Sequence, residues 1–199
     1  MINQKSIFLQ KYRYSLVLLK ELVVTDFKLR YQSSTLGYIW SLLRPTFLFL
    51  ILYVVFVKII PVGNNIPHFP AYLLLGLMLW NYFVEVTTGS VQAVVGKGDL
   101  MRKISFPRYV IILSGTVSAI INLGLNLIVV AILMVASGAE PNIYSLFAPL
   151  LLLELIVFSL SIALFLGAGY VKYRDIGYVW DVFIQAGFYA TPILYSFSL

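Results

Sequence analysis

A long run without a single charged residue occupies residues 109–138, and it reads YVIILSGTVSAIINLGLNLIVVAILMVASG. A helix needs about 20 mostly apolar residues to cross the hydrocarbon core of a membrane, so this run is long enough to cross with some tilt. Transmembrane β-strands instead alternate apolar and polar residues over about ten positions. The run is too long and too uniformly apolar for that pattern, and it predicts a transmembrane helix.

Apolar runs of similar length lie on both sides of this one. They predict four more transmembrane helices, at residues 39–60, 72–95, 146–171 and 177–196. The chain has 199 residues and is 61% hydrophobic but only 11% charged, whereas about 25% charge is usual in a soluble domain. We therefore predict an all-α, polytopic membrane protein with five transmembrane helices, forming one domain over residues 1–199.

The basic residues are distributed unequally between the two sides of the membrane. If the five runs alternate in direction, the N-terminal segment and the connections 97–108 and 172–175 lie on one side. Together with Arg44 at the edge of the first run, they hold every Lys and Arg except Lys58. Short loops rich in Lys and Arg stay in the cytoplasm, so the N-terminus is predicted to be cytoplasmic. This bias, rather than nucleic-acid binding, accounts for the net charge of +6.

The segment before the first run has a different pattern. In residues 12–31, charged residues interleave with apolar ones that recur in steps of three and four: Leu16, Leu19, Val23, Phe27 and Tyr31. Lys20, Lys28 and Arg30 mark the more polar sides. This spacing predicts an amphipathic helix that lies in the cytoplasmic membrane interface. It is either a plain membrane anchor or an anchor that also contacts a partner protein.

Three acidic residues, Glu85, Glu154 and Asp181, fall inside the predicted spans. A carboxylate in this position is costly, so it either pairs with a polar group or serves a function. Pairing with neighbouring helices, an aqueous substrate path and a proton relay all remain open. The chain has no Cys and one His, which excludes thiolate chemistry and a His-based metal cluster. Asp99 and Asp175 are isolated, so no catalytic carboxylate pair is expected.

Four groups of residues stand out along the chain. They are residues 26–31 (DFKLRY) running into 36–40 (LGYIW) and Pro45, residues 76–80 (GLMLW), residues 102–108 (RKISFPR), and residues 174–176 (RDI) followed by 191–195 (TPILY). In this order they resemble the membrane subunit of type-2 ABC exporters, in the subfamily that exports polysaccharides and polyol phosphates such as O-antigen, capsule and teichoic acid. That family usually has six spans and a cytoplasmic C-terminus. The resemblance therefore implies a longer protein of which this chain is a truncated form.

The resemblance also implies partners. Two copies of the chain would pair in the inner membrane of a bacterium, above two separate ATP-binding subunits. The chain lacks a Gly-x-x-x-x-Gly-Lys-Ser/Thr phosphate loop, so ATP and Mg²⁺ are expected in the partner, and the chain itself is expected to be a transport subunit without cofactor or enzymatic activity. The resemblance implies that the following residues couple to the ATPase: Asp99, Leu100, Arg102, Lys103, Phe106 and Pro107. Lys28, Arg30 and Tyr31 of the interface helix would lie beside the same partner.

The resemblance implies a cargo path between the two copies, lined mainly by the spans 39–60 and 177–196. We expect Arg44 and nearby basic residues to receive the pyrophosphate of a polyprenyl-linked glycan from the inner leaflet, and Trp40 to belong to the same path. Tyr189 and Tyr195 are expected near the exit. The alternatives are an ABC permease for a drug or small lipid, and an ion-coupled transporter or flippase that uses the intramembrane acids. A membrane-embedded sugar transferase is disfavoured because no acidic pair occurs in a cytoplasmic loop.

Overall fold

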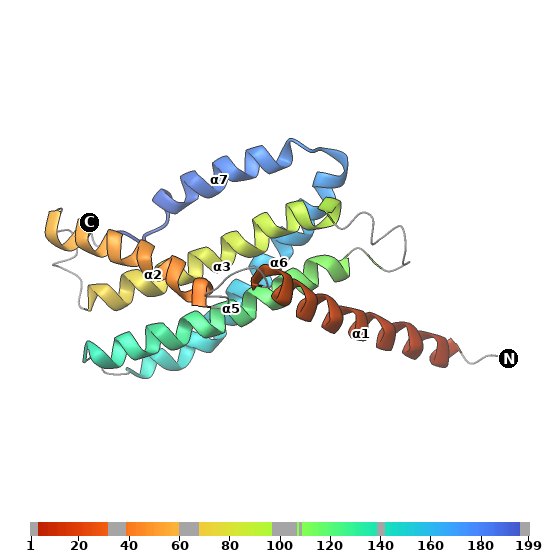
Figure 1. Cartoon of the computed structure of the whole chain (residues 1–199), viewed down its shortest axis with the longest axis horizontal. Helices are drawn as coiled ribbons and strands as arrows, with labels where there is room; N and C mark the ends of the chain where they lie inside the picture. Colours follow the sequence, from red (N-terminus) through yellow and green to blue (C-terminus); the bar gives the residue numbers. More distant parts are fainter. Residues whose placement is uncertain are drawn as a thin grey trace.

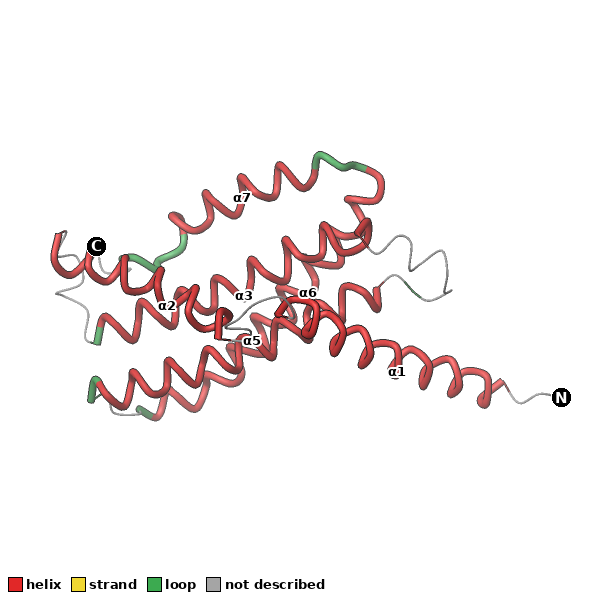
Figure 2. The backbone as a smooth tube through the Cα atoms, viewed as in Figure 1, coloured by secondary structure: helices red, strands yellow, loops and turns green. Residues whose placement is uncertain are grey.

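The structure is a computed structural model, and it describes residues 4–31, 39–59, 68–96, 107, 109–138 and 142–195. The described residues form helices joined by turns, and no strand occurs among them (Figure 2). This confirms the predicted all-α class. The long apolar runs form helices because a buried or lipid-covered backbone must satisfy its hydrogen bonds within its own segment.

The centre of the molecule is a bundle of three long helices. These are α3 (Phe69–Gly96), α5 (Tyr109–Ala136) and α6 (Ala148–Lys172). Helix α3 packs against both of the others, and it also contacts α2 (Ile39–Val54) on one side and α7 (Ile176–Ala190) on another (Figure 1). Helix α3 is therefore the element on which the rest of the bundle is assembled.

Among the residues that the structure describes, four helices are long and apolar enough to cross a membrane. They extend over Ile39–Ile59, Phe69–Ala93, Tyr109–Ala136 and Ile143–Lys172. These bounds agree within a few residues with the first four predicted spans. The first helix ends in a π-helical turn, η1 (Val55–Ile59), and the fourth begins with a 3₁₀ turn, η3 (Ile143–Phe147). Asn142 caps that turn, since its side-chain oxygen accepts a hydrogen bond from the Ile143 amide at 2.6 Å.

The fifth predicted span is shorter than expected. We predicted residues 177–196, but α7 has 15 residues and ends at Ala190. Such a helix is about 22 Å long, whereas the hydrocarbon core is about 30 Å thick. The helix stops there because Pro192 cannot donate a backbone hydrogen bond and disfavours helical geometry at the preceding residue. The count of five spans is therefore not confirmed.

Helix α1 (Gln4–Tyr31) begins earlier than the predicted interface helix. Its C-terminal part contacts α5, and the rest extends away from the bundle beyond the end of α3 (Figure 1). The burial differs from the predicted apolar face: Leu16 is 47% exposed, whereas Leu22 is only 8% exposed. Contact with α5, rather than the repeat alone, selects the buried side. That α1 lies in the membrane interface stays a prediction.

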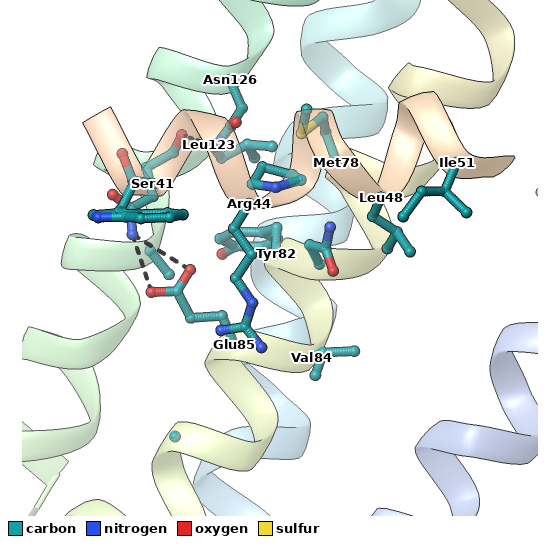
Figure 3. Close-up of a pocket in the computed structure, with 16 residues that line it drawn as sticks. Ser41, Arg44, Leu48, Ile51, Met78, Tyr82, Val84, Glu85, Leu123 and Asn126 are labelled. Carbon is teal, nitrogen blue, oxygen red and sulfur yellow. Dashed lines mark hydrogen bonds between the residues drawn. The ribbon is translucent and has the colours of Figure 1, made fainter. Parts of the chain in front are cut away.

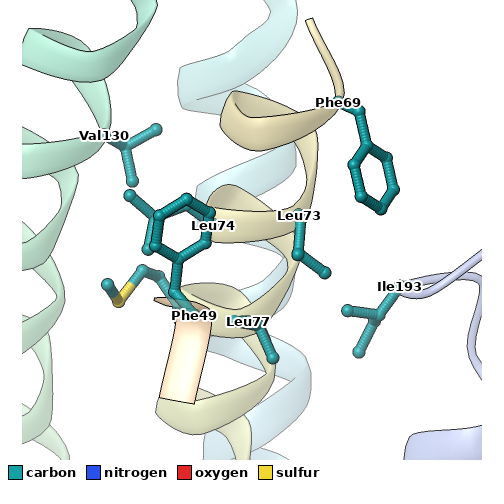
Figure 4. Packing of buried hydrophobic residues seen from close by; sticks show 8 residues of the cluster. Phe49, Phe69, Leu73, Leu74, Leu77, Val130 and Ile193 are labelled. Atoms are coloured by element: carbon teal, nitrogen blue, oxygen red, sulfur yellow. The ribbon is translucent and has the colours of Figure 1, made fainter. Parts of the chain in front are cut away.

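A hydrophobic cluster joins α2, α3, α5 and the turn after α7. Phe49, Leu73, Val130 and Ile193 belong to it, and Figure 4 shows them converging from these separate elements. The Tyr72 hydroxyl lies within hydrogen-bonding reach of the backbone oxygens of Pro192 and Tyr195, the latter at 3.2 Å. The turn after α7 is thus held against the first part of α3 by both apolar and polar contacts.

Candidate functional site

A cavity of about 850 Å³ lies between α2, α3 and α5. Figure 3 shows side chains from these three helices around it. Its polar lining consists of Trp40, Ser41, Arg44, Asn81, Tyr82, Glu85, Asn122 and Asn126, and the remaining lining is mostly apolar. Sites for small molecules typically have volumes of about 300–1,000 Å³ and combine an apolar wall with a few polar groups. The cavity has both properties.

Helix α5 supplies one wall through a row of polar residues with a period of four. Ser114, Ser118, Asn122 and Asn126 share one face of this otherwise apolar helix, because residues four apart lie nearly above one another. All four side chains are buried. The two serines lie outside the cavity lining, whereas the two asparagines belong to it. The row therefore begins with the two serines, where α5 is buried outside the cavity, and continues with the two asparagines in the cavity wall.

Helix α3 places Glu85 opposite this row. The Asn122 amide nitrogen donates hydrogen bonds to the Glu85 carboxylate, at 3.1 Å and 3.5 Å to its two oxygens. The Asn126 amide nitrogen donates to the Asn122 backbone oxygen at 2.8 Å. Pairing with a polar group of a neighbouring helix was one of the roles left open for Glu85. The contact supplies such a partner, and Glu85 also lines the cavity.

Three buried polar atoms at the cavity have no hydrogen-bond partner among the described residues. They are the Tyr82 hydroxyl and the side-chain oxygens of Asn122 and Asn126. These side chains are only 2%, 6% and 8% exposed, respectively. An unsatisfied buried polar group costs about 1–3 kcal/mol, so such groups in a folded protein call for an explanation.

Arg44 and Trp40 lie at the same cavity, as part of α2. Figure 3 shows Arg44 and Glu85 extending into one space from α2 and α3. The other two residues predicted for the cargo path lie elsewhere. Tyr189 is 71% exposed on α7, and the Tyr195 hydroxyl donates to the Ala190 backbone oxygen at 2.9 Å. The predicted path residues therefore occupy two separate places within one copy of the chain.

The three intramembrane acids do not share a site. Asp181 lines a smaller pocket of about 170 Å³ between α3, α6 and α7, together with Gln92 and Arg174. Glu154 is exposed on α6 and lines neither this pocket nor the cavity that holds Glu85. Among the described residues, no group of three or more His, Cys, Asp or Glu side chains could hold a metal ion.

Most of the predicted coupling segment lies outside the described residues. This applies to Asp99, Leu100, Arg102, Lys103 and Phe106. Pro107 is described, and its backbone oxygen accepts from the Val110 amide at 3.1 Å, just before α5. In the predicted interface helix, Lys28 is exposed, while the side chains of Arg30 and Tyr31 are not described.

Sequence reasoning missed Tyr82, Asn122 and Asn126. A signal for the two asparagines was present, because polar residues at every fourth position in a charge-free span mark one face of the helix. Tyr82 carries no such signal, since tyrosines are frequent in this chain. Only the packing of α3 against α5 shows that its hydroxyl is buried.

Comparison with known proteins identifies the family. A family model described as ABC-2 type transporter matches residues 17–199. The chain belongs to the ABC-2 type transporter family. It is 33% identical over 181 residues to the O-antigen export system permease protein RfbA of Myxococcus xanthus, covering 91% of this chain and 69% of that protein. It is also 29% identical over 191 residues to the protein of the same name from Klebsiella pneumoniae, covering 94% and 73%, respectively.

Membership in the ABC-2 type transporter family confirms the resemblance found in the sequence motifs. It makes this chain a transport subunit and, with its several long apolar helices, a multi-pass membrane protein. The cavity between α2, α3 and α5 thus lies in the membrane-spanning part of an ABC-2 permease.

Proposed function

We propose that this chain is the permease subunit of an ATP-driven exporter that moves a lipid-linked polysaccharide across the bacterial inner membrane. The observation that carries the proposal is the similarity to O-antigen export permeases over more than nine-tenths of the chain. The chain contains no phosphate loop, so a separate ATP-binding subunit supplies the energy. Two copies of each subunit form the transporter, and the N-terminus is cytoplasmic.

Exposed apolar surfaces are compatible with pairing of two permeases. Phe47 on α2 is 52% exposed without lining the cavity, and Val182 on α7 is 66% exposed. A second copy would cover part of these two helices, and lipid would cover the rest. The cargo would then pass between the copies, along α2 and α7.

Affinity purification tests the requirement for an ATPase. The tagged chain is extracted from membranes in mild detergent, and the proteins that accompany it are identified by mass spectrometry. An ABC ATP-binding subunit near one-to-one stoichiometry is expected. Recovery of the chain without any such subunit, from the cells that naturally produce it, would instead favour an ion-coupled transporter.

A double charge reversal tests the coupling segment. Arg102→Glu with Lys103→Glu is expected to remove most of the associated ATPase and to stop export. Lys97→Glu with Arg108→Glu is the matched control, because it changes the charge of the same loop equally at positions that flank the proposed segment. Equal ATPase recovery from both variants would show that residues 99–107 are not the coupling segment.

The proposed phosphate site is tested at Arg44. Hydrogen bonds to a charged group contribute about 1.5–3 kcal/mol, so Arg44→Ala should lower export of the glycan by about tenfold or more. Lys58→Ala, at the other end of the same membrane-spanning helix, should leave export unchanged. Normal surface glycan in cells that carry Arg44→Ala would rule out the phosphate role.

A further inference from the structure

The unpaired atoms at the α2–α3–α5 cavity have fixed hydrogen-bonding roles. The Asn122 amide nitrogen faces the Glu85 carboxylate, and the Asn126 amide nitrogen faces a backbone oxygen. Flipping either amide would set oxygen against oxygen, so both side-chain oxygens are acceptors that lack a donor. With the Glu85 carboxylate they form an acceptor-rich wall, to which Tyr82 adds a hydroxyl that can donate or accept.

Elsewhere in the bundle, buried hydroxyls donate hydrogen bonds to backbone oxygens of their own helices. Ser114 donates to the Ile111 oxygen at 2.8 Å, and Ser118 donates to the Ser114 oxygen at 3.0 Å. On α6, Ser159 donates to the Leu155 oxygen at 2.7 Å. Among the described residues, the unmet hydrogen bonds of buried side chains therefore gather at the pockets: Trp180 Nε1 lacks a partner at the smaller pocket that Asp181 lines, and the other three such atoms lie at this cavity. They indicate a ligand that supplies several donors.

The size and charge of the cavity narrow the class of ligand. A volume of about 850 Å³ is far larger than a single cation needs, and it suits an organic molecule. Arg44 adds a positive charge whose guanidinium can bind a phosphate through parallel hydrogen bonds. Trp40 adds an aromatic ring, 46% exposed, on which the apolar face of a sugar ring can stack. A phosphate joined to a hydroxylated ring matches all of these groups.

We propose that the cavity between α2, α3 and α5 of each single chain binds the hydroxylated headgroup of a phosphate-linked lipid. The phosphate pairs with Arg44, while sugar hydroxyls donate to Asn122 and Asn126 and exchange a hydrogen bond with Tyr82. For its class of cargo, this inference rests on the proposed function. It moves the phosphate site of Arg44 from the expected path between two copies to a cavity inside one permease.

Binding to the full chain in nanodiscs of neutral phospholipid tests this site. The probes are an alkyl phosphohexose, the same alkyl phosphate without the sugar, and a free hexose phosphate as competitor. The expected result is that the alkyl phosphohexose binds more tightly than the alkyl phosphate. Tyr82→Phe and Asn126→Leu should each weaken the phosphohexose by about fivefold, the effect of one lost hydrogen bond. Neither should weaken the alkyl phosphate.

Tyr82→Phe is the more informative variant, because it removes only a hydroxyl that has no partner among the described residues. It should therefore keep or raise the thermal unfolding midpoint, which separates lost binding from lost structure. Tyr53→Phe is the matched control, since Tyr53 lies on α2, packs against the cluster around Phe49 and does not line the cavity. Its affinity for the phosphohexose should equal that of the unchanged chain.

Three results would overturn the inference. Equal affinity for the two alkyl probes would show that the sugar is not recognised. Binding that requires Na⁺ or K⁺ and is insensitive to the sugar would show that the acceptors hold a cation. Competition by the free hexose phosphate as strong as that of the alkyl form would show that the headgroup arrives without a lipid. Each of these results leaves the association with an ATPase intact, so the failure of this site is distinguishable from failure of the proposed function.

Discussion

Two regions of the bundle share the helices α3 and α5: the contact that these helices form with α6, and the cavity that they form with α2. The two regions differ in whether their buried polar side chains have hydrogen-bond partners. At the three-helix contact, Ser90 and Ser159 are buried, and each hydroxyl donates a hydrogen bond of 2.7 Å to a backbone oxygen of its own helix. At the cavity, Tyr82 and Asn126 are buried with atoms that have no partner among the described residues.

The difference follows from the chemistry of the side chains. A serine or threonine hydroxyl can reach a backbone oxygen one turn earlier, so it can be buried in a membrane helix at little cost. An amide has both donors and acceptors, and one helix does not satisfy them all. An asparagine that is buried in a membrane helix therefore needs hydrogen bonds from a neighbouring helix, water or a ligand, whereas a serine does not.

The largest effect is expected where the three-helix contact is tightest. A Cβ atom at Gly167 would lie 2.7 Å from the Ile112 side chain and 3.4 Å from the Ser90 backbone oxygen. Gly167→Leu should therefore lower the free energy of unfolding by about 3 kcal/mol, through overpacking. Gly124→Leu is the control, because nothing lies within 4 Å of a Cβ at that position. Denaturation in detergent compares them, and equal stability would contradict the close packing.

The next effect concerns the pair that joins the cavity walls. Asn122→Leu removes the amide that donates to the Glu85 carboxylate at 3.1 Å, and a hydrogen bond to a charged group contributes about 1.5–3 kcal/mol. We expect the single variant to lose about 2 kcal/mol of unfolding free energy. The double variant with Glu85→Leu should lose less than the sum of the two single variants. Additive losses in this double-mutant cycle would show that the pair is not coupled.

A second tyrosine on α3 offers a contrast with Tyr82. The Tyr72 hydroxyl is paired with backbone oxygens of the turn after α7, including that of Tyr195 at 3.2 Å. Tyr72→Phe should cost about 1 kcal/mol, the typical value of one hydrogen bond. It should also speed up hydrogen exchange in residues 191–195. Unchanged exchange in that turn would mean that the apolar contact of Ile193 alone holds it in place.

The smallest effects are expected from removing single hydroxyls. Ser118→Ala removes a hydrogen bond of 3.0 Å within α5 and should change the free energy of unfolding by less than about 0.6 kcal/mol. Tyr82→Phe removes a hydroxyl without a partner among the described residues, so it should be neutral or stabilise the chain by up to about 1 kcal/mol. A clear loss of stability from Tyr82→Phe would show that its hydroxyl has a structural partner.

The sequence by itself determined the class of the protein, four of its membrane-spanning helices and its family. These properties depend on the length of apolar runs and on short motifs, which are local and can be read along the chain. The cytoplasmic N-terminus and the coupling segment come from the same reasoning, from charge bias and from the family resemblance, and they stay predictions. The apolar run 177–196 predicts a last helix that continues past Pro192, whereas the structure ends it at Ala190.

Only the tertiary structure decided which polar residues share a cavity. A hydrophobic span shows no preferred face when nearly every residue is apolar, so its rotation about its own axis is set by packing against neighbours. That packing pairs Glu85 with Asn122, buries the Tyr82 hydroxyl and gathers Arg44 into the same cavity. It also separates Glu85 from Asp181 and Glu154, which the sequence had placed together as intramembrane acids. The site depends on contacts between distant segments, and such contacts are not encoded in any single run of residues.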